Sequence, residues 1–210
     1  MPTIYVMTSN SMNRMVRLTS EITLADLENK QVSYEKAFLS QVEKWLIKPC
    51  ERLLSKQDTD YRMSVFSILL MYFETHGQYL EGKTSQGKSK DFFIKSLREF
   101  IEFLRGNKLF EEEIEDVFFD NFYKFARCGL FHSTSMSNHF LIDCINFSEL
   151  PISKNPIHGG FLINVDSFKD AIWDYAKNYI EKVENDSQLK KNFNLIFETL
   201  ILKPLKNYSS

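Results

Sequence analysis

Apolar residues recur every three or four positions along most of the chain, which is the spacing of one face of an α-helix. The clearest run follows a polar cap at Asp58 or Thr59 and continues to about Leu80. Pro49 predicts a kink or a break in the first helix, and Pro204 predicts the end of the last. The predicted helices cover about residues 33–56, 58–80, 91–105, 110–128, 166–183 and 187–202.

Two short apolar runs lack this spacing. Phe140–Ile145 and Phe161–Val165 are strand-like, and the prolines and glycines between them indicate a long loop. The predicted fold is therefore mainly all-α: an antiparallel helical bundle with a short β-hairpin insertion.

The same pattern divides the chain into three parts. Residues 1–32 show no sustained periodicity and form an N-terminal arm whose structure the sequence leaves open. Residues 33–133 form a helical core, and residues 134–210 add the hairpin and two C-terminal helices that pack on it. Because the chain has 210 residues, we expect one globular unit.

Composition narrows the class of protein. The chain has 19 Phe against 7 Gly and 5 Pro, which favours an ordered, packed core. Its net charge is −2 with a pI near 6.1, so a polyanion such as RNA would have to be held by a local basic patch. Three widely spaced cysteines indicate neither a disulfide framework nor a zinc site. No run approaches the ~18 apolar residues of a membrane span, so we expect a cytoplasmic protein without a membrane partner.

Reactive side chains cluster in residues 123–133, YKFARCGLFHS, where the fourth predicted helix ends. Arg127, Cys128 and His132 lie around Gly129, and a polar turn that begins at Ser133 follows. On an unbroken helix Arg127 and His132 would point to different sides. They can cooperate only if the helix bends or ends near Gly129, or if a second subunit supplies the missing group.

Arg127, four residues and then His132, at the end of a helix in a mainly helical chain, resembles the R-x4–6-H motif of the HEPN superfamily. The resemblance covers about residues 33–133. It implies a metal-independent endoribonuclease that works as a homodimer, without cofactor, with Arg127 and His132 as the catalytic residues. Such a protein would be a toxin or a defence or stress effector, with an antitoxin as a possible protein partner.

The chemistry of the two side chains suits this role. A guanidinium binds phosphate through two hydrogen bonds and stabilises charge that develops during transfer. An imidazole, with a pKa near ~6.5, can take the proton of the ribose 2′-hydroxyl or protonate the leaving 5′-oxygen. One imidazole cannot do both at once, so a two-fold dimer would supply the second. The product would carry a 2′,3′-cyclic phosphate.

Four more residues are candidate supporting groups: Cys128, Ser133, Glu74 and His76. Each also has a structural interpretation: a small core filler, a loop residue, an exposed helical carboxylate and a buried histidine. His132 can likewise be a core or capping histidine, with Arg127 in solvent. Cys128 stands where active HEPN nucleases carry a polar residue. This difference favours a second function: a non-catalytic HEPN-like module that binds RNA, a nucleotide or a protein partner.

Other site classes find no support in the sequence. GKTSQGKS at residues 82–89 lacks the spacing of a phosphate-binding loop and follows a helix. The histidines are scattered, so no metal site is expected, and the G-x-S-x-G turn of serine hydrolases is absent.

Overall fold

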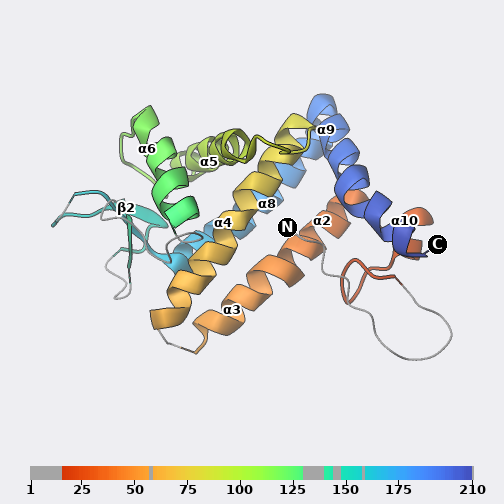
Figure 1. Ribbon diagram of the computed structural model, residues 1–210, viewed down its shortest axis with the longest axis horizontal. Coiled ribbons are helices and arrows are strands. Elements are labelled where there is room, and N and C mark those ends of the chain that lie inside the picture. Colours follow the sequence, from red (N-terminus) through yellow and green to blue (C-terminus); the bar gives the residue numbers. More distant parts are fainter. Residues whose placement is uncertain (1–15, 57–58, 130–139, 144–147, 158, 210) are drawn as a thin grey trace.

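The computed structural model describes residues 16–56, 59–129, 140–143, 148–157 and 159–209. The predicted class is confirmed, since most of these residues are helical and the described strands form one small sheet (Figure 1). The elements are α1 (Leu24–Glu28), α2 (Tyr34–Val42), η1 (Glu43–Ile47), α3 (Lys48–Leu54), α4 (Thr59–Glu81), α5 (Ser89–Gly106), α6 (Asp116–Asn121), η2 (Phe122–Cys128), β1 (Phe140–Ile142), β2 (Ile152–Lys154), β3 (Phe161–Ile163), α8 (Val165–Asn185), α9 (Ser187–Phe197), η3 (Glu198–Leu202) and α10 (Lys203–Ser209). None of the helices among these residues is long and apolar enough to cross a membrane.

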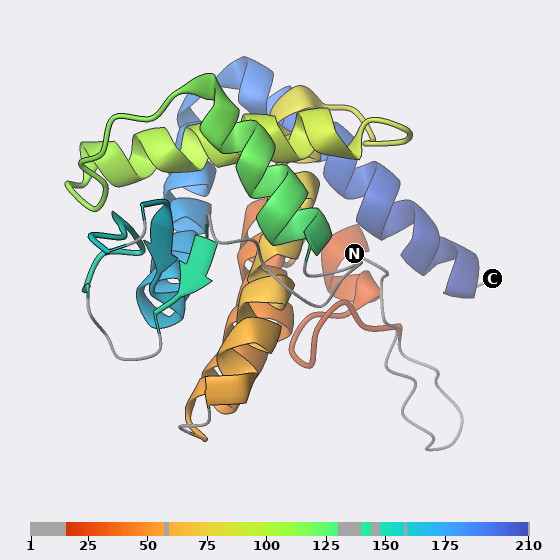
Figure 2. The ribbon, with the colours of Figure 1, turned by 60° about the vertical axis from the view of Figure 1, so that its left-hand side comes forward.

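Helix α4 is the centre of the fold. It packs against α3, α5, α8 and α9, and in Figure 1 it runs alongside α3 with α8 behind it. Figure 2 shows α5 lying across one end of α4. Because α4 is apolar on several sides, it is buried along most of its length, as expected for a helix without one polar face. Phe66 and Phe73 each meet the Phe168 ring of α8 edge to face, at 5.3 and 6.1 Å.

Helices α4 and α5 approach each other closely at Gly77. A Cβ atom placed there would lie 2.2 Å from the backbone oxygen of Phe92 and 2.7 Å from its carbonyl carbon. Only a residue without a side chain allows the two backbones to come so near. Gly77 therefore fixes the depth at which α5 crosses α4.

Two long helices each contain one wide, π-helical turn. Helices α2 and α3 are joined through η1, and α9 and α10 through η3, so that each pair forms one continuous helix. The N–H of Lys48 bonds to Glu43 O and that of Lys203 bonds to Glu198 O, five residues back. A proline follows closely in both cases, and a proline ring would clash with the carbonyl of the preceding α-helical turn. The prediction that Pro204 ends the last helix is therefore wrong, because the wide turn lets the helix continue to Ser209.

Part of the predicted N-terminal arm belongs to the core. Leu18, Ile22, Leu24 and Leu27 are buried in the same hydrophobic cluster as the helices. Thr23 caps α1 in a reciprocal capping box with Asp26, so a short helix forms inside the segment predicted as an arm. Residues 1–15 lie outside the described part of the chain.

The sheet corrects the predicted hairpin. Phe140–Ile142 and Phe161–Ile163 do pair, but parallel, whereas β2 pairs antiparallel with β3, in the order β1-β3-β2. The hairpin is thus formed by β2 and β3, and its turn is closed by the N–H of Asn155 bonding to Gly160 O. β2 was missed because Pro151 directly precedes it and only three residues form it.

The fourth predicted helix begins later than expected, at Asp116 rather than near Phe110. The acidic residues at positions 111–113 and 115 therefore precede the helix, and Asp116 is the acidic residue in its first turn. Phe110 is buried and its ring packs against that of Phe118.

Candidate functional site

The described part of the chain contains half of the predicted motif. Arg127 and Cys128 are the last residues of η2, and Glu74 and His76 lie on α4. His132 and Ser133 lie outside the described residues, so the structure gives no positions for them. What it does show is the environment of Arg127 immediately before them.

Arg127 reaches its position through the continuous helix of α6 and η2. Phe118, Phe122 and Ala126 form its buried stripe, and Phe122 meets the rings of Phe66 and Phe140 edge to face. The last turns are wide, since the N–H of Gly129 bonds to Lys124 O, five residues back. A wide turn changes which side chains share a face. Arg127 is half-buried and pairs with a carboxylate of α4, so the alternative interpretation that leaves it in solvent is wrong.

Arg127 pairs with Glu74. The Arg127 Nη2 atom lies 3.7 Å from Glu74 Oε2, and the two side chains are 23% and 24% exposed. The other carboxylate oxygen, Oε1, accepts hydrogen bonds of 2.8 Å from the hydroxyls of Ser85 and Ser89. Three side chains, from the loop before α5, the first residue of α5 and η2, therefore hold the carboxylate, and the carboxylate in turn orients the guanidinium.

The loop between α4 and α5 supports this arrangement. Besides the two serine hydroxyls, the N–H of Ser85 bonds to Gln78 Oε1 at 3.0 Å. No sequence signal indicated that Ser85 and Ser89 would bond to the carboxylate of Glu74, which lies 11 and 15 residues earlier in the chain.

Cys128 and Tyr123 complete the cluster. Cys128 is a free, half-buried thiol beside the hydroxyl of Tyr123. Burial raises the pKa of Tyr123, and the neighbouring Cys128 raises it further, while the positive charge of Arg127 opposes the rise. Tyr123 packs edge to face on Phe93, with ring centroids 5.3 Å apart. It was not a candidate from the sequence, because nothing there distinguishes it from the many other aromatic residues of the chain.

His76 lies apart from this cluster. It is fully buried, its Nδ1 is 2.9 Å from Ser96 Oγ, and its ring stacks on Tyr72 with centroids 5.2 Å apart. Burial lowers the pKa of His76 to about 3, so the imidazole is neutral at physiological pH. The structure thus brings Glu74 to Arg127 and keeps His76 within the core.

The described residues contain no group of three or more His, Cys, Asp or Glu side chains that could hold a metal ion. No protein-family model matches the chain, and comparisons with curated proteins and with solved structures find no match either. The likeness to HEPN proteins therefore rests on the residues of this chain.

Proposed function

We propose that this protein is a HEPN-like, metal-independent endoribonuclease that acts in the cytoplasm as a toxin or as a defence or stress effector. The observation that supports the proposal best is the Arg127–Glu74 pair. It places an oriented, half-buried guanidinium at the end of a helix, directly before the segment that carries His132. A fixed guanidinium is the group that phosphoryl transfer requires.

In the proposed reaction Arg127 binds the scissile phosphate and stabilises the charge that develops on its oxygens. His132 removes the proton from the 2′-hydroxyl, whose oxygen attacks the phosphorus and displaces the 5′-oxygen. The leaving oxygen takes its proton from His132 of the second subunit of a homodimer. The products are a 2′,3′-cyclic phosphate and a 5′-hydroxyl, and no metal-bound water takes part.

The remaining residues of the cluster act as positioning groups in this proposal. Glu74 holds the guanidinium while no RNA is bound, and Ser85 and Ser89 hold Glu74. Cys128 directly follows Arg127 and Ser133 directly follows His132 in the sequence, and neither is assigned a chemical step.

The same ion pair supports a second candidate, a non-catalytic module that binds RNA, a nucleotide or a protein partner such as an antitoxin. A carboxylate 3.7 Å from the guanidinium offsets the positive charge that would attract phosphate. The net charge of −2 supplies no compensating field. The two functions share one surface and differ in whether RNA is cleaved.

Cleavage of structured and single-stranded RNAs in EDTA separates the two candidates. Wild type should cleave, His132→Ala should not, and Arg127→Ala should lose about 10²–10³ in rate, the usual effect of a missing transition-state donor. Arg98→Ala is the matched control, because Arg98 pairs with Asp116 and lies over the Phe119 ring rather than pairing with Glu74. Its rate should equal that of wild type.

Two results would contradict the nuclease. Cleavage that persists in His132→Ala would indicate a contaminant or another site. No cleavage of any RNA by wild type would favour the non-catalytic module, and RNA binding weakened by Arg127→Ala but not by Arg98→Ala would then establish the shared surface.

A further inference from the structure

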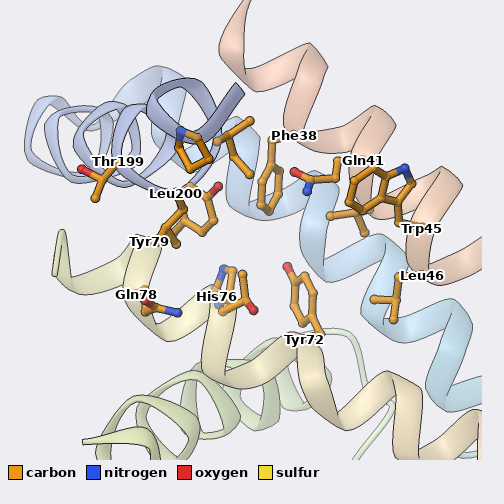
Figure 3. Close-up of a pocket in the computed structure, with 14 residues that line it drawn as sticks. Phe38, Gln41, Trp45, Leu46, Tyr72, His76, Gln78, Tyr79, Thr199 and Leu200 are labelled. Atoms are coloured by element: carbon orange, nitrogen blue, oxygen red, sulfur yellow. The ribbon is translucent and has the colours of Figure 1, made fainter. Parts of the chain in front are cut away.

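A cavity of about 220 Å³ lies beside α4, on the side that carries His76 (Figure 3). Tyr72, His76 and Tyr79 of α4 form one wall, and Figure 3 shows their side chains directed toward Phe38 and Leu200 across the space. Glu74 and Arg127 do not line it. The cavity is thus separate from the proposed nuclease site.

Both π-helical turns next to prolines contribute to this cavity. Trp45 and Leu46 come from η1, and Thr199, Leu200 and Ile201 come from η3. π-helical turns are rare and are frequently found at functional sites, because the extra residue bends the helix surface and redirects side chains. Two such turns on opposite walls of one cavity indicate that the space is a built feature of the fold.

The α4 wall contains buried polar atoms without a hydrogen-bond partner among the described residues. These are Tyr72 Oη and His76 Nε2, on side chains that are 3% and 0% exposed. The ring of His76 is fixed from behind, since Nδ1 contacts Ser96 Oγ at 2.9 Å. Buried polar groups in native proteins nearly always have a partner, either in the protein or in a bound water or ligand. Two such atoms facing one cavity therefore favour an occupant that supplies the missing hydrogen bonds.

The charge of the walls limits what the cavity can take. None of the described lining residues is Asp, Glu, Lys or Arg, and the lining is mainly aromatic and aliphatic. Burial keeps the pKa of His76 low, at about 3, so its imidazole is neutral as well. A charged ligand would lose its hydration without gaining a counter-ion.

The volume sets the size of the ligand. An apolar protein cavity of ~150 Å³ holds a benzene ring, so a space of about 220 Å³ suits a fused bicycle of about nine non-hydrogen atoms. We propose that this cavity binds a neutral bicyclic aromatic heterocycle whose polar edge bonds to Tyr72 Oη and His76 Nε2. Its rings pack against Phe38, Trp45 and Leu200. The Ser96 hydroxyl can donate or accept, so His76 can present Nε2 either as a donor or as an acceptor.

Indazole is a suitable probe because it is neutral, has this size, and carries an N–H donor beside a nitrogen acceptor. Isothermal titration of the full chain should give a Kd below about 1 mM. Benzoate, of similar size but anionic, should not bind. Tyr72→Phe removes one partner of the ligand and should weaken indazole binding about 10-fold, the usual effect of one lost hydrogen bond.

Tyr179→Phe is the matched control. The Tyr179 hydroxyl is also buried without a hydrogen-bond partner in the described chain and its ring also packs against His76, but it does not line the cavity. This variant should bind indazole as wild type does. Neither substitution is expected to lower Tm, since each deletes an unsatisfied buried hydroxyl and keeps the ring.

Three outcomes would overturn the proposal. They are no binding of indazole by wild type, benzoate binding as tight as that of indazole, and equal weakening in the two tyrosine variants. The nuclease assay is unaffected by any of them, so failure here leaves the proposed function standing.

Discussion

Replacing Gly77 by alanine is expected to destabilise the protein by about 2 kcal/mol, even though alanine is the better helix former. The new Cβ would lie 2.2 Å from Phe92 O, 2.7 Å from its carbonyl carbon and 3.0 Å from its Cα. These are backbone atoms of α5, so no side-chain rotation can relieve the contact. The helices would have to separate by roughly 1 Å, which loosens the packing of the buried pair Phe73 and Phe93.

Two opposing effects set the magnitude. Alanine in a helix interior gains about 1 kcal/mol over glycine, while overpacking a dense core costs about 1–3 kcal/mol and more where backbone must move. The clash is expected to win because it involves two rigid helices. For a chain of this length a net loss of about 2 kcal/mol lowers Tm by about 4–8 °C.

Gly106→Ala is the matched comparison, because the same change is made at the end of α5 where a Cβ meets nothing within 4 Å. This variant should gain about 0.4–1 kcal/mol. Both variants and wild type would be compared by thermal and urea unfolding followed by circular dichroism. A Gly77→Ala variant as stable as wild type would refute the close crossing of α4 and α5.

Two further predictions concern pH and assembly. Burial lowers the pKa of His76 to about 3, against ~6.5 in the unfolded chain. Below pH ~6.5 the unfolded chain therefore binds a proton that the folded protein does not. The free energy of unfolding should fall toward pH 3 by up to about 1.4 kcal/mol per pH unit because of this group. Urea unfolding between pH 7 and 5 should show a steeper loss for wild type than for His76→Asn, whereas parallel losses would exclude His76 as the cause. The proposed reaction needs two His132 side chains, so light scattering at tens of micromolar should give a homodimer; a monomer would count against catalysis.

The sequence predicted those elements whose apolar spacing is long and regular. Helix α4 and helix α8 begin and end within a few residues of the predicted bounds, because a sustained stripe dominates over local propensity. The continuation past Pro204 and the three-residue strand β2 were missed. In both cases a proline is a strong local signal, and the tertiary structure overrides it with a wide turn or an edge position.

The surroundings of the candidate site were harder to predict than the fold. The motif itself is local in sequence, so Arg127 and Cys128 could be selected by inspection. The partner of Arg127 could not, because Glu74 is distant along the chain and only the packing of η2 on α4 and α5 brings the two charges together. The cavity was beyond sequence reasoning for the same reason, since its walls come from three separate helices.

The wide turns η1 and η3 also determine how the chain can tolerate changes in length. A π-helical turn holds one residue more than an α-helical turn, and one residue rotates everything after it by about 100° around the helix axis. Cys50 and Leu205, fully buried just beyond the two turns, therefore owe their inward direction to that extra residue. Insertions and deletions in helices usually turn an apolar face outward. Each of these two turns already contains one extra residue, and the apolar faces of the helix before and after the turn are both directed into the core.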